Sequence, residues 1–233
     1  SGRVVRPDVV VWPENSSDID PFGNRDAAAQ IDRAARAIGV PILVGAVIAG
    51  SNGTSRNTLV VWDPVTGPGQ EHDKRQLVPF GEYLPLRELM TQLSSYASRA
   101  GNFVPGTGNG VVDLAGEPVA VATCYEVAFD DLVTESVRAG AQLIAVPTNN
   151  ATFGRTEMTY QQLAMSRVRA VEHGRAVVIA ATSGVSAVIE PDGTVAQRTA
   201  LFTPDVLIAR VPLRTTTTLA TRIGAAGEGI CAA

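Results

Sequence analysis

Cysteine and histidine are both scarce in this chain, which has two of each among its 233 residues. Two cysteines, Cys124 and Cys231, do not make the disulfide framework of a small secreted domain. Cys231 lies in a tail rich in glycine and alanine, and no bond to Cys124 is expected because that tail would have to fold back. His72 lies in a polar stretch and His173 at the end of a predicted helix, so neither is well placed for a Cys-His catalytic pair.

The sequence also lacks a long apolar run. The longest, residues 40–49, has about half the length of a membrane-spanning helix and contains Pro41 and Gly45. The first residues have neither the apolar core nor the cleavage site of a signal peptide. Taken alone, the sequence predicts a soluble chain.

No strong excess of charge is present either. A net charge of −4 and a pI near 5.2 give no electrostatic footprint for nucleic acid. With 45% hydrophobic and 18% charged residues, the composition excludes general disorder. A chain of this length can bury the core of one large domain, and no linker or repeat divides it.

Short apolar runs alternate with stretches of helical spacing, which predicts the α/β class. Strands are predicted at residues 8–12, 41–49, 57–62, 110–114, 118–122, 142–146, 176–181, 186–190 and 206–211. Helices are predicted at residues 24–38, 86–96, 124–138 and 156–173. The second and third strands are expected to form an antiparallel hairpin. The last helix has a predicted inner stripe of Tyr160, Leu163, Ala164, Val168 and Val171.

Residues 63–85 are expected to be irregular. Residues 63–69 read as a turn rich in proline and glycine, and residues 71–85 form a polar stretch broken by prolines. A long irregular segment inside a compact domain is usually functional or disordered, and the aromatic and apolar residues here favour a functional loop.

Cys124 directly follows the apolar run at residues 118–122, where the chain is predicted to turn from strand into helix. A thiol at such a turn is exposed to the helix N-terminus, which favours the thiolate and predicts a lowered pKa. The alternative is that Cys124 is a small buried apolar side chain. On the turn alone, this alternative is favoured.

Two further polar residues lie near strand ends: Glu14 after residues 8–12, and Lys74 in the loop after residues 57–62. Ligands bind at strand ends in open α/β sheets. Together with Cys124, these residues would supply a base, a cation and a nucleophile for acyl transfer. Taken singly, Glu14 is interpreted as a turn or cap residue and Lys74 as a solvated residue. Only the three residues together indicate a catalytic site.

Three segments resemble the carbon–nitrogen hydrolase (nitrilase) superfamily: Trp12-Pro13-Glu14, Lys74-Arg-Gln-Leu-Val-Pro-Phe-Gly-Glu82-Tyr-Leu-Pro85 and Cys124-Tyr125-Glu126. The second segment resembles one branch, the bacterial apolipoprotein N-acyltransferases, and the likeness extends from about Asp8 to Leu213. It implies an α-β-β-α sandwich of two mixed sheets with helices on the outer faces. The family's first strand and helix would precede Asp8, and membrane helices would flank a single catalytic domain covering residues 1–233.

The resemblance implies Glu14 as general base, Lys74 as the oxyanion-stabilising cation and Cys124 as nucleophile. Its further implied site residues, for catalytic support or substrate binding, are Glu82, Tyr125, Glu126 and Asn149. No metal or cofactor is implied. The family usually has Asn-Asp-x-Trp-Phe-Gly where this chain reads Asn149-Asn150-Ala-Thr152-Phe153-Gly154, which alters the expected substrate pocket.

The activity implied by the resemblance is transfer of a fatty acyl chain from a phospholipid, through a cysteine thioester, to the N-terminal amine of a diacylglyceryl-cysteine lipoprotein. The implied partners are the phospholipid donor, the diacylated lipoprotein and a membrane surface, without nucleic acid. The implied location is the extracytoplasmic face of a bacterial cell membrane. One alternative is a soluble amidase that hydrolyses a small amide or nitrile with the same three residues. Another is a domain that only binds.

Overall fold

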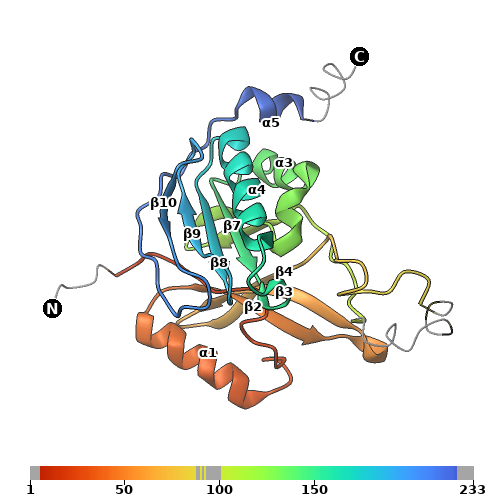
Figure 1. Ribbon diagram of the computed structural model, residues 1–233. Coiled ribbons are helices and arrows are strands. Elements are labelled where there is room, and N and C mark those ends of the chain that lie inside the picture. Colours follow the sequence, from red (N-terminus) through yellow and green to blue (C-terminus); the bar gives the residue numbers. More distant parts are fainter. Residues whose placement is uncertain (1–5, 88–89, 91, 93–100, 225–233) are drawn as a thin grey trace.

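The chain folds into four layers, in which two β-sheets pack face to face between helices, as Figure 1 shows for this computed structural model. The structure describes residues 6–87, 90, 92 and 101–224. Helix α1 (Arg25–Ile38) covers the outer face of one sheet. Helices α3 (Asp130–Arg138) and α4 (Met158–His173) cover the outer face of the other. The implied α-β-β-α sandwich is therefore confirmed.

The first sheet has the order β1-β2-β3-β4. Its strands are β1 (Val10–Val11), β2 (Ile42–Ala49), β3 (Ser55–Asp63) and β4 (Gly67–Asp73). β1 is parallel to β2 and the other pairings are antiparallel, which confirms the predicted hairpin. The turn predicted at residues 63–69 is confirmed for residues 64–66, but its second half and the predicted irregular start of the next stretch were wrong, because Gly67–Asp73 form β4. Backbone pairing with β3 makes β4 a strand despite its polar and glycine-rich sequence.

The second sheet has the order β10-β9-β8-β7-β6-β5. Its strands are β5 (Val111–Leu114), β6 (Glu117–Val121), β7 (Leu143–Thr148), β8 (Val177–Ala181), β9 (Ala187–Ile189) and β10 (Val195–Arg198). The three middle strands β6, β7 and β8 run parallel, so their carboxyl ends lie at one edge of the sheet. The strand predicted at residues 206–211 was wrong. The β9–β10 hairpin extends the sheet instead, and Val206 and Ile208 are exposed.

Each interface between layers has its own apolar core. Between the sheets, the core includes Leu43 and Leu59 from the first sheet and Val121 and Ala145 from the second. Beneath α1 and beneath the α3–α4 pair lie two further clusters. At about 25 cal/mol per Å² of buried apolar area, these cores supply the main driving force that holds the strand ends in place.

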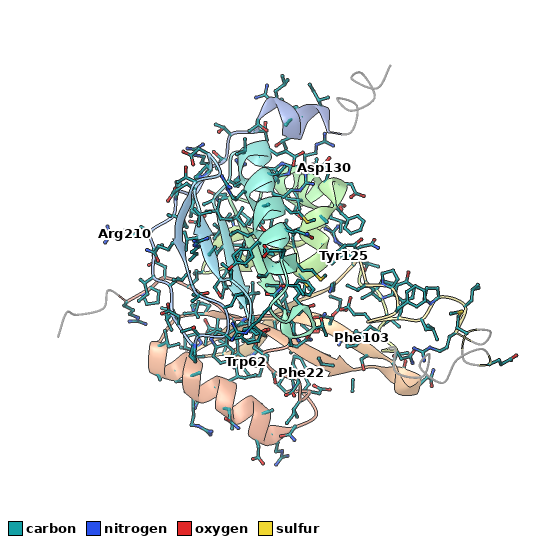
Figure 2. All side chains as sticks on the ribbon, in the orientation of Figure 1. Phe22, Trp62, Phe103, Tyr125, Asp130 and Arg210 are labelled. Atoms are coloured by element: carbon teal, nitrogen blue, oxygen red, sulfur yellow. The ribbon has the colours of Figure 1, made fainter. Side chains whose placement is uncertain are left out.

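Helix α1 forms as its sequence predicts. Asn24 caps it by accepting hydrogen bonds from the backbone N–H groups of Asp26 at 3.0 Å and Ala27 at 3.1 Å. Gly39 ends it with a φ of 75°, which glycine adopts without strain. Its side chains pack against the sheet around Trp62, labelled in Figure 2, whose indole N–H donates to Asp32 at 2.8 Å.

The inner stripe predicted for α4 was wrong except for Leu163. Tyr160, Ala164, Val168 and Val171 face outward. The buried face is largely polar: Thr159, Gln162, Leu163, Ser166, Ala170 and His173. These residues keep the three- and four-residue spacing of a helix face, but their polarity hid it from a search for apolar periodicity.

The helix predicted at residues 86–96 lies mostly outside the described residues, and so does Cys231. Shorter helical turns complete the described part: η1 (Ser51–Gly53), η3 (Cys124–Ala128), η4 (Ala151–Phe153) and α5 (Leu219–Ile223). Among the described residues, no helix combines the length and apolarity needed to cross a bilayer.

Candidate active site

Three strand ends bring Glu14, Lys74 and Cys124 together where the two sheets meet. Glu14 follows β1, Lys74 directly follows β4, and Cys124 lies three residues beyond β6. Their exposed fractions are 4%, 2% and 6%, so bulk water is largely excluded from them. Lys74 Nζ lies 3.0 Å from Glu14 Oε1, and both charged groups lie close enough to Cys124 to shift the pKa of its thiol.

Lys74 lies between two carboxylates. Its Nζ is 3.0 Å from Glu14 Oε1 and 3.0 Å from Glu82 Oε1. Burial by itself lowers the pKa of the Lys74 ammonium, but the negative charges of Glu14 and Glu82, and that of Cys124 once it is ionised, outweigh burial, and the net effect raises this pKa. Lys74 is therefore a fixed cation at neutral pH.

Backbone and amide groups hold the two glutamates. The side-chain amide of Asn57, in β3, donates to Glu14 Oε1 at 2.7 Å and to Glu82 Oε1 at 2.8 Å. The backbone N–H of Asn149 donates to Glu14 Oε2 at 2.7 Å. Asn57 was missed by the sequence analysis. A buried polar residue at the start of an apolar strand is the signal that could have identified it.

Cys124 occupies a strained backbone position, because its φ of 54° lies in the left-handed region that non-glycine residues rarely adopt. The continuous helix predicted from this residue is divided. Residues 124–128 form the 3-10 turn η3, Phe129 is extended, and α3 begins at Asp130. The positive φ lets the chain leave β6 sharply and places the thiol among Glu14, Lys74 and Thr148.

The lowered pKa expected for Cys124 was wrong. Burial, followed by the negative charge of Glu14, raises the pKa of the thiol to about 11, although Lys74 and the Thr148 hydroxyl act in the opposite direction. The dipole of a five-residue 3-10 turn is too weak to offset the effect of a buried carboxylate on the pKa of the thiol. The resting side chain is therefore a neutral thiol that needs a base.

Glu126 connects the cysteine turn to the segment that carries Lys74. Its carboxylate accepts backbone hydrogen bonds from Thr123 at 2.7 Å, Arg75 at 2.7 Å and Gln76 at 3.0 Å. Burial raises the pKa of Glu126, while these three N–H groups oppose that shift. Because its oxygens are committed to the backbone, Glu126 acts as a support that fixes two segments relative to each other.

Tyr125 has a different surrounding from its two neighbours. Its side chain is 44% exposed and packs edge-on against Phe129, with ring centroids 5.0 Å apart and planes at 87°. Figure 2 labels Tyr125 near the start of α3. The side chain directly after the thiol is therefore partly exposed to solvent, while Cys124 and Glu126 are buried.

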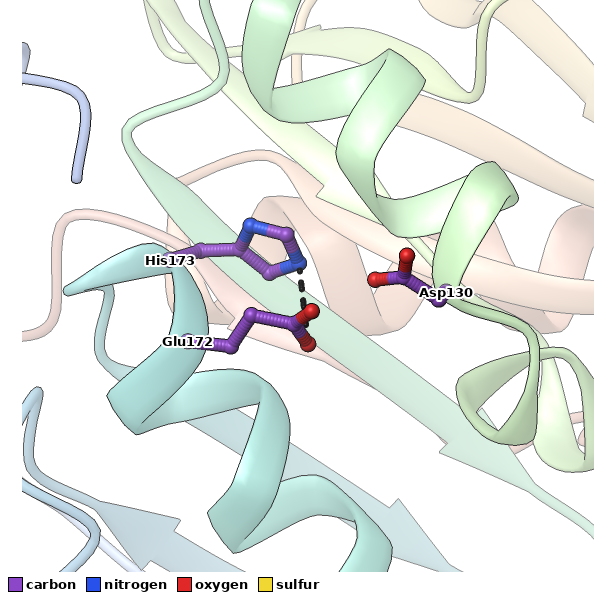
Figure 3. Close-up of side chains that lie close together, drawn as sticks. All are labelled: Asp130, Glu172 and His173. Atoms are coloured by element: carbon purple, nitrogen blue, oxygen red, sulfur yellow. Dashed lines mark ion pairs between the residues drawn. The ribbon is translucent and has the colours of Figure 1, made fainter. Parts of the chain in front are cut away.

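Figure 3 shows a second cluster of ionisable side chains, at the start of α3 and the end of α4. Ligand-type atoms of Asp130, Glu172 and His173 lie within 4.8 Å of one another. The guanidinium of Arg169 already pairs with both carboxylates, at 2.9 Å to Asp130, and its Nε donates to the Val127 carbonyl at 3.1 Å. Arg169 thus supplies the positive charge that a metal ion would bring, and it ties α4 to the turn that carries Cys124.

Protonation of this cluster is unusual. Burial and a hydrogen bond with Asp130 raise the pKa of Glu172 to about 7. Burial and the charge of Arg169 lower the pKa of His173 to about 4. Near neutrality His173 is therefore uncharged, and the two carboxyl groups share a proton beside Arg169.

Comparisons with known proteins agree with this geometry. Residues 8–221 match the family model described as "Carbon-nitrogen hydrolase". The chain is 54% identical over 229 residues to the apolipoprotein N-acyltransferase of Mycolicibacterium smegmatis, covering 96% of this chain and 38% of that protein. It is 33% identical to the apolipoprotein N-acyltransferase of Geobacter metallireducens, covering 88% of this chain and 40% of that protein. The chain therefore spans about two fifths of the length of these relatives.

Solved structures share the fold at low identity. An amidase from Nesterenkonia sp. superposes with a TM-score of 0.61 at 22% identity, covering 85% of this chain and 74% of that one. A carbon-nitrogen hydrolase from Helicobacter pylori G27 superposes with a TM-score of 0.66 at 14% identity, covering 88% and 77%. At these identities the likeness concerns the fold alone.

Proposed function

The chain belongs to the carbon–nitrogen hydrolase family, and on that premise we propose that Glu14, Lys74 and Cys124 are its base, oxyanion-stabilising cation and nucleophile. The observation that carries the proposal is a neutral buried thiol in contact with a carboxylate that is itself paired with a fixed cation. This arrangement allows a proton to leave sulfur only toward Glu14, at the moment when the nucleophile is needed.

The first half-reaction is acylation of Cys124. Its S–H proton moves to Glu14 while sulfur bonds to the carbonyl carbon of a phospholipid ester. Lys74 and the backbone N–H of Tyr125 stabilise the oxyanion, and loss of one such donor typically costs about 2.7–4 kcal/mol. The ester C–O bond then breaks, and the lysophospholipid leaves with the proton held by Glu14. A thioester remains on Cys124.

The second half-reaction transfers the acyl group to an amine. The N-terminal amine of a diacylglyceryl-cysteine lipoprotein attacks the thioester carbonyl and gives a proton to Glu14. The C–S bond breaks, sulfur recovers that proton, and the product is an amide. Support for these substrates comes from the relatives named apolipoprotein N-acyltransferase, and the scheme predicts ping-pong kinetics.

The segment after Lys74 supports a lipid substrate. Phe80 and Leu86 are 62% and 75% exposed, and both have positive φ values, 64° and 49°. Large apolar side chains held outward on strained backbone suit contact with acyl chains or a membrane surface. On this proposal the chain is the single catalytic domain of a longer enzyme, placed at the extracytoplasmic face of a bacterial cell membrane.

The test is mass spectrometry of the intact protein after incubation with phospholipid vesicles. An adduct with the mass of one acyl group is expected on the wild type and on Cys231→Ser, and none on Cys124→Ser. Adding a diacylated lipopeptide amine should discharge the adduct and yield the N-acyl product. Absence of the adduct from the wild type, with ammonia released from small amides instead, would identify an amidase and overturn the proposal.

A further inference from the structure

A network of buried polar side chains connects the site to helix α4. Gln162, on the inner face of α4, contacts both Thr148 and Asn150. Thr148 is completely buried, and Asn150 and Gln162 are 1% and 7% exposed. Buried amides and hydroxyls cost free energy unless they are paired. The concentration of three of them between the end of β7 and helix α4, next to the site, therefore calls for a functional explanation.

The strand register brings this network of polar side chains close to the sulfur atom of Cys124. β6 and β7 are parallel, with Val121 opposite Ala145. The pairing continues with the backbone N–H of Ala122, which donates to the Ala145 carbonyl at 3.0 Å. Extending this register by three residues from Val121 and Ala145 places Cys124 next to Thr148. The Thr148 hydroxyl lies close enough to the Cys124 side chain to lower the pKa of the thiol, which favours the thiolate.

The side-chain amides of Asn150 and Gln162 donate toward Thr148, and the Thr148 hydroxyl also lies 3.2 Å from Gln162 Oε1, to which it can donate. Asn150 Nδ2 donates to Gln162 Oε1 at 2.9 Å, and Gln162 Nε2 donates to Thr148 Oγ1 at 3.0 Å. A hydroxyl that accepts from Gln162 Nε2 has its own proton left for the sulfur. We propose that Thr148 donates to the Cys124 thiolate as it forms, and that Gln162 and Asn150 are positioning residues that orient its hydroxyl. This inference rests on the proposed nucleophilic role of Cys124.

Two adjacent asparagines thereby position the two groups that exchange the proton, Glu14 and Cys124. The backbone N–H of Asn149 holds Glu14, and the side chain of Asn150 starts the network of hydrogen bonds that leads to Cys124. Gly184 makes room for it, because a Cβ atom there would lie 2.2 Å from Asn150 Oδ1. The residue that departs from the usual family motif at this position thus has a defined contact in this chain.

Alkylation of Cys124 by iodoacetamide tests the proposal, in a Cys231→Ser background so that one thiol reacts. Between pH 7 and pH 9 the rate follows the thiolate fraction, since the thiol is mostly protonated there. Thr148→Val, which removes the hydroxyl and keeps the shape, is expected to lower the rate about tenfold, the equivalent of one pKa unit. Thr148→Ser keeps the hydroxyl and should stay within about twofold of the parent.

Gln162→Leu provides a second variant. It removes the donor that orients the Thr148 hydroxyl and should lower the rate by about threefold, an intermediate loss. Equal alkylation rates for Thr148→Val and Thr148→Ser would overturn the proposal. They would mean that the Thr148 proton points to Gln162 Oε1, which lies 3.2 Å away. Because alkylation needs no acyl donor or acceptor, its outcome is independent of whether the acyl-transfer assay succeeds.

Discussion

The Lys74 ammonium lies 3.0 Å from a carboxylate oxygen of Glu14, and the two side chains are only 1% and 5% exposed. Neither charge has water to stabilise it, so each depends on the other and on the few groups around them. A buried pair of this kind is costly to assemble and more costly to break, because removing one partner leaves the other charge uncompensated.

Lys74→Met is expected to destabilise the fold by about 3–5 kcal/mol, since Glu14 and Glu82 would then face each other without a cation. Chemical denaturation would measure the loss. Arg36→Met, which breaks an exposed ion pair with Asp32, is the matched control and should cost about 0.5 kcal/mol or less. Equal effects of the two substitutions would contradict the burial argument.

Glu126→Gln should lower the rate of Cys124 acylation and also reduce stability by about 1–3 kcal/mol. An amide NH2 group would face one of the three backbone N–H donors that Glu126 now accepts, which would separate the cysteine turn from the Lys74 segment. Single-turnover acylation and denaturant unfolding measure the two effects. The same change at exposed Glu157 is the control, and a Glu126→Gln variant indistinguishable from it would refute the supporting role.

Cys124→Gly should be more stable than Cys124→Ala by about 1 kcal/mol, although both variants lack the thiol. The φ of 54° strains any residue with a Cβ atom and leaves glycine unstrained. Midpoints of urea unfolding compare the two directly. A less stable glycine variant would show that the backbone at this position carries no strain.

Glu172→Gln should raise stability at pH 8 and leave it unchanged near pH 4. The folded protein holds the Glu172 proton up to about pH 7, whereas the unfolded chain releases it near the ordinary value of 4.5. Stability from this group is therefore lost as pH rises between these values, by about 1 kcal/mol after allowance for solvent screening at a partly exposed site. Thermal unfolding across pH 4–8 would show a flatter profile for the variant, and parallel profiles would contradict the assignment.

The sequence predicted the layered α/β fold and most of its strands because short apolar runs and helix caps are local signals. The hairpin at residues 41–62 and the helix capped by Asn24 show this directly. The predictions failed where contact with a neighbouring element, rather than the local sequence, decides the structure. β4 is a strand because β3 lies beside it, and the polar face of α4 is buried because Thr148 and Asn150 meet it.

For the site, sequence reasoning brought Glu14, Lys74 and Cys124 into one hypothesis, and the structure brings their side chains together. It did not identify Asn57 or Gln162, because neither lies in a recognisable motif and each makes its contacts with a different element of the fold. It also assigned the wrong direction to the pKa of Cys124, since the effect of burial beside a carboxylate depends on the packed structure.

Glu14 and Lys74 come from the four-stranded sheet, and Cys124 comes from the six-stranded sheet. During synthesis Glu14 and Lys74 leave the ribosome before Cys124, and they meet it only when the second sheet docks on the first. A partly folded chain would therefore carry an ordinary, unassisted cysteine. On the proposed mechanism, Cys124 becomes reactive only when the two sheets have packed together. A nascent or damaged copy would therefore not transfer acyl groups to unintended acceptors.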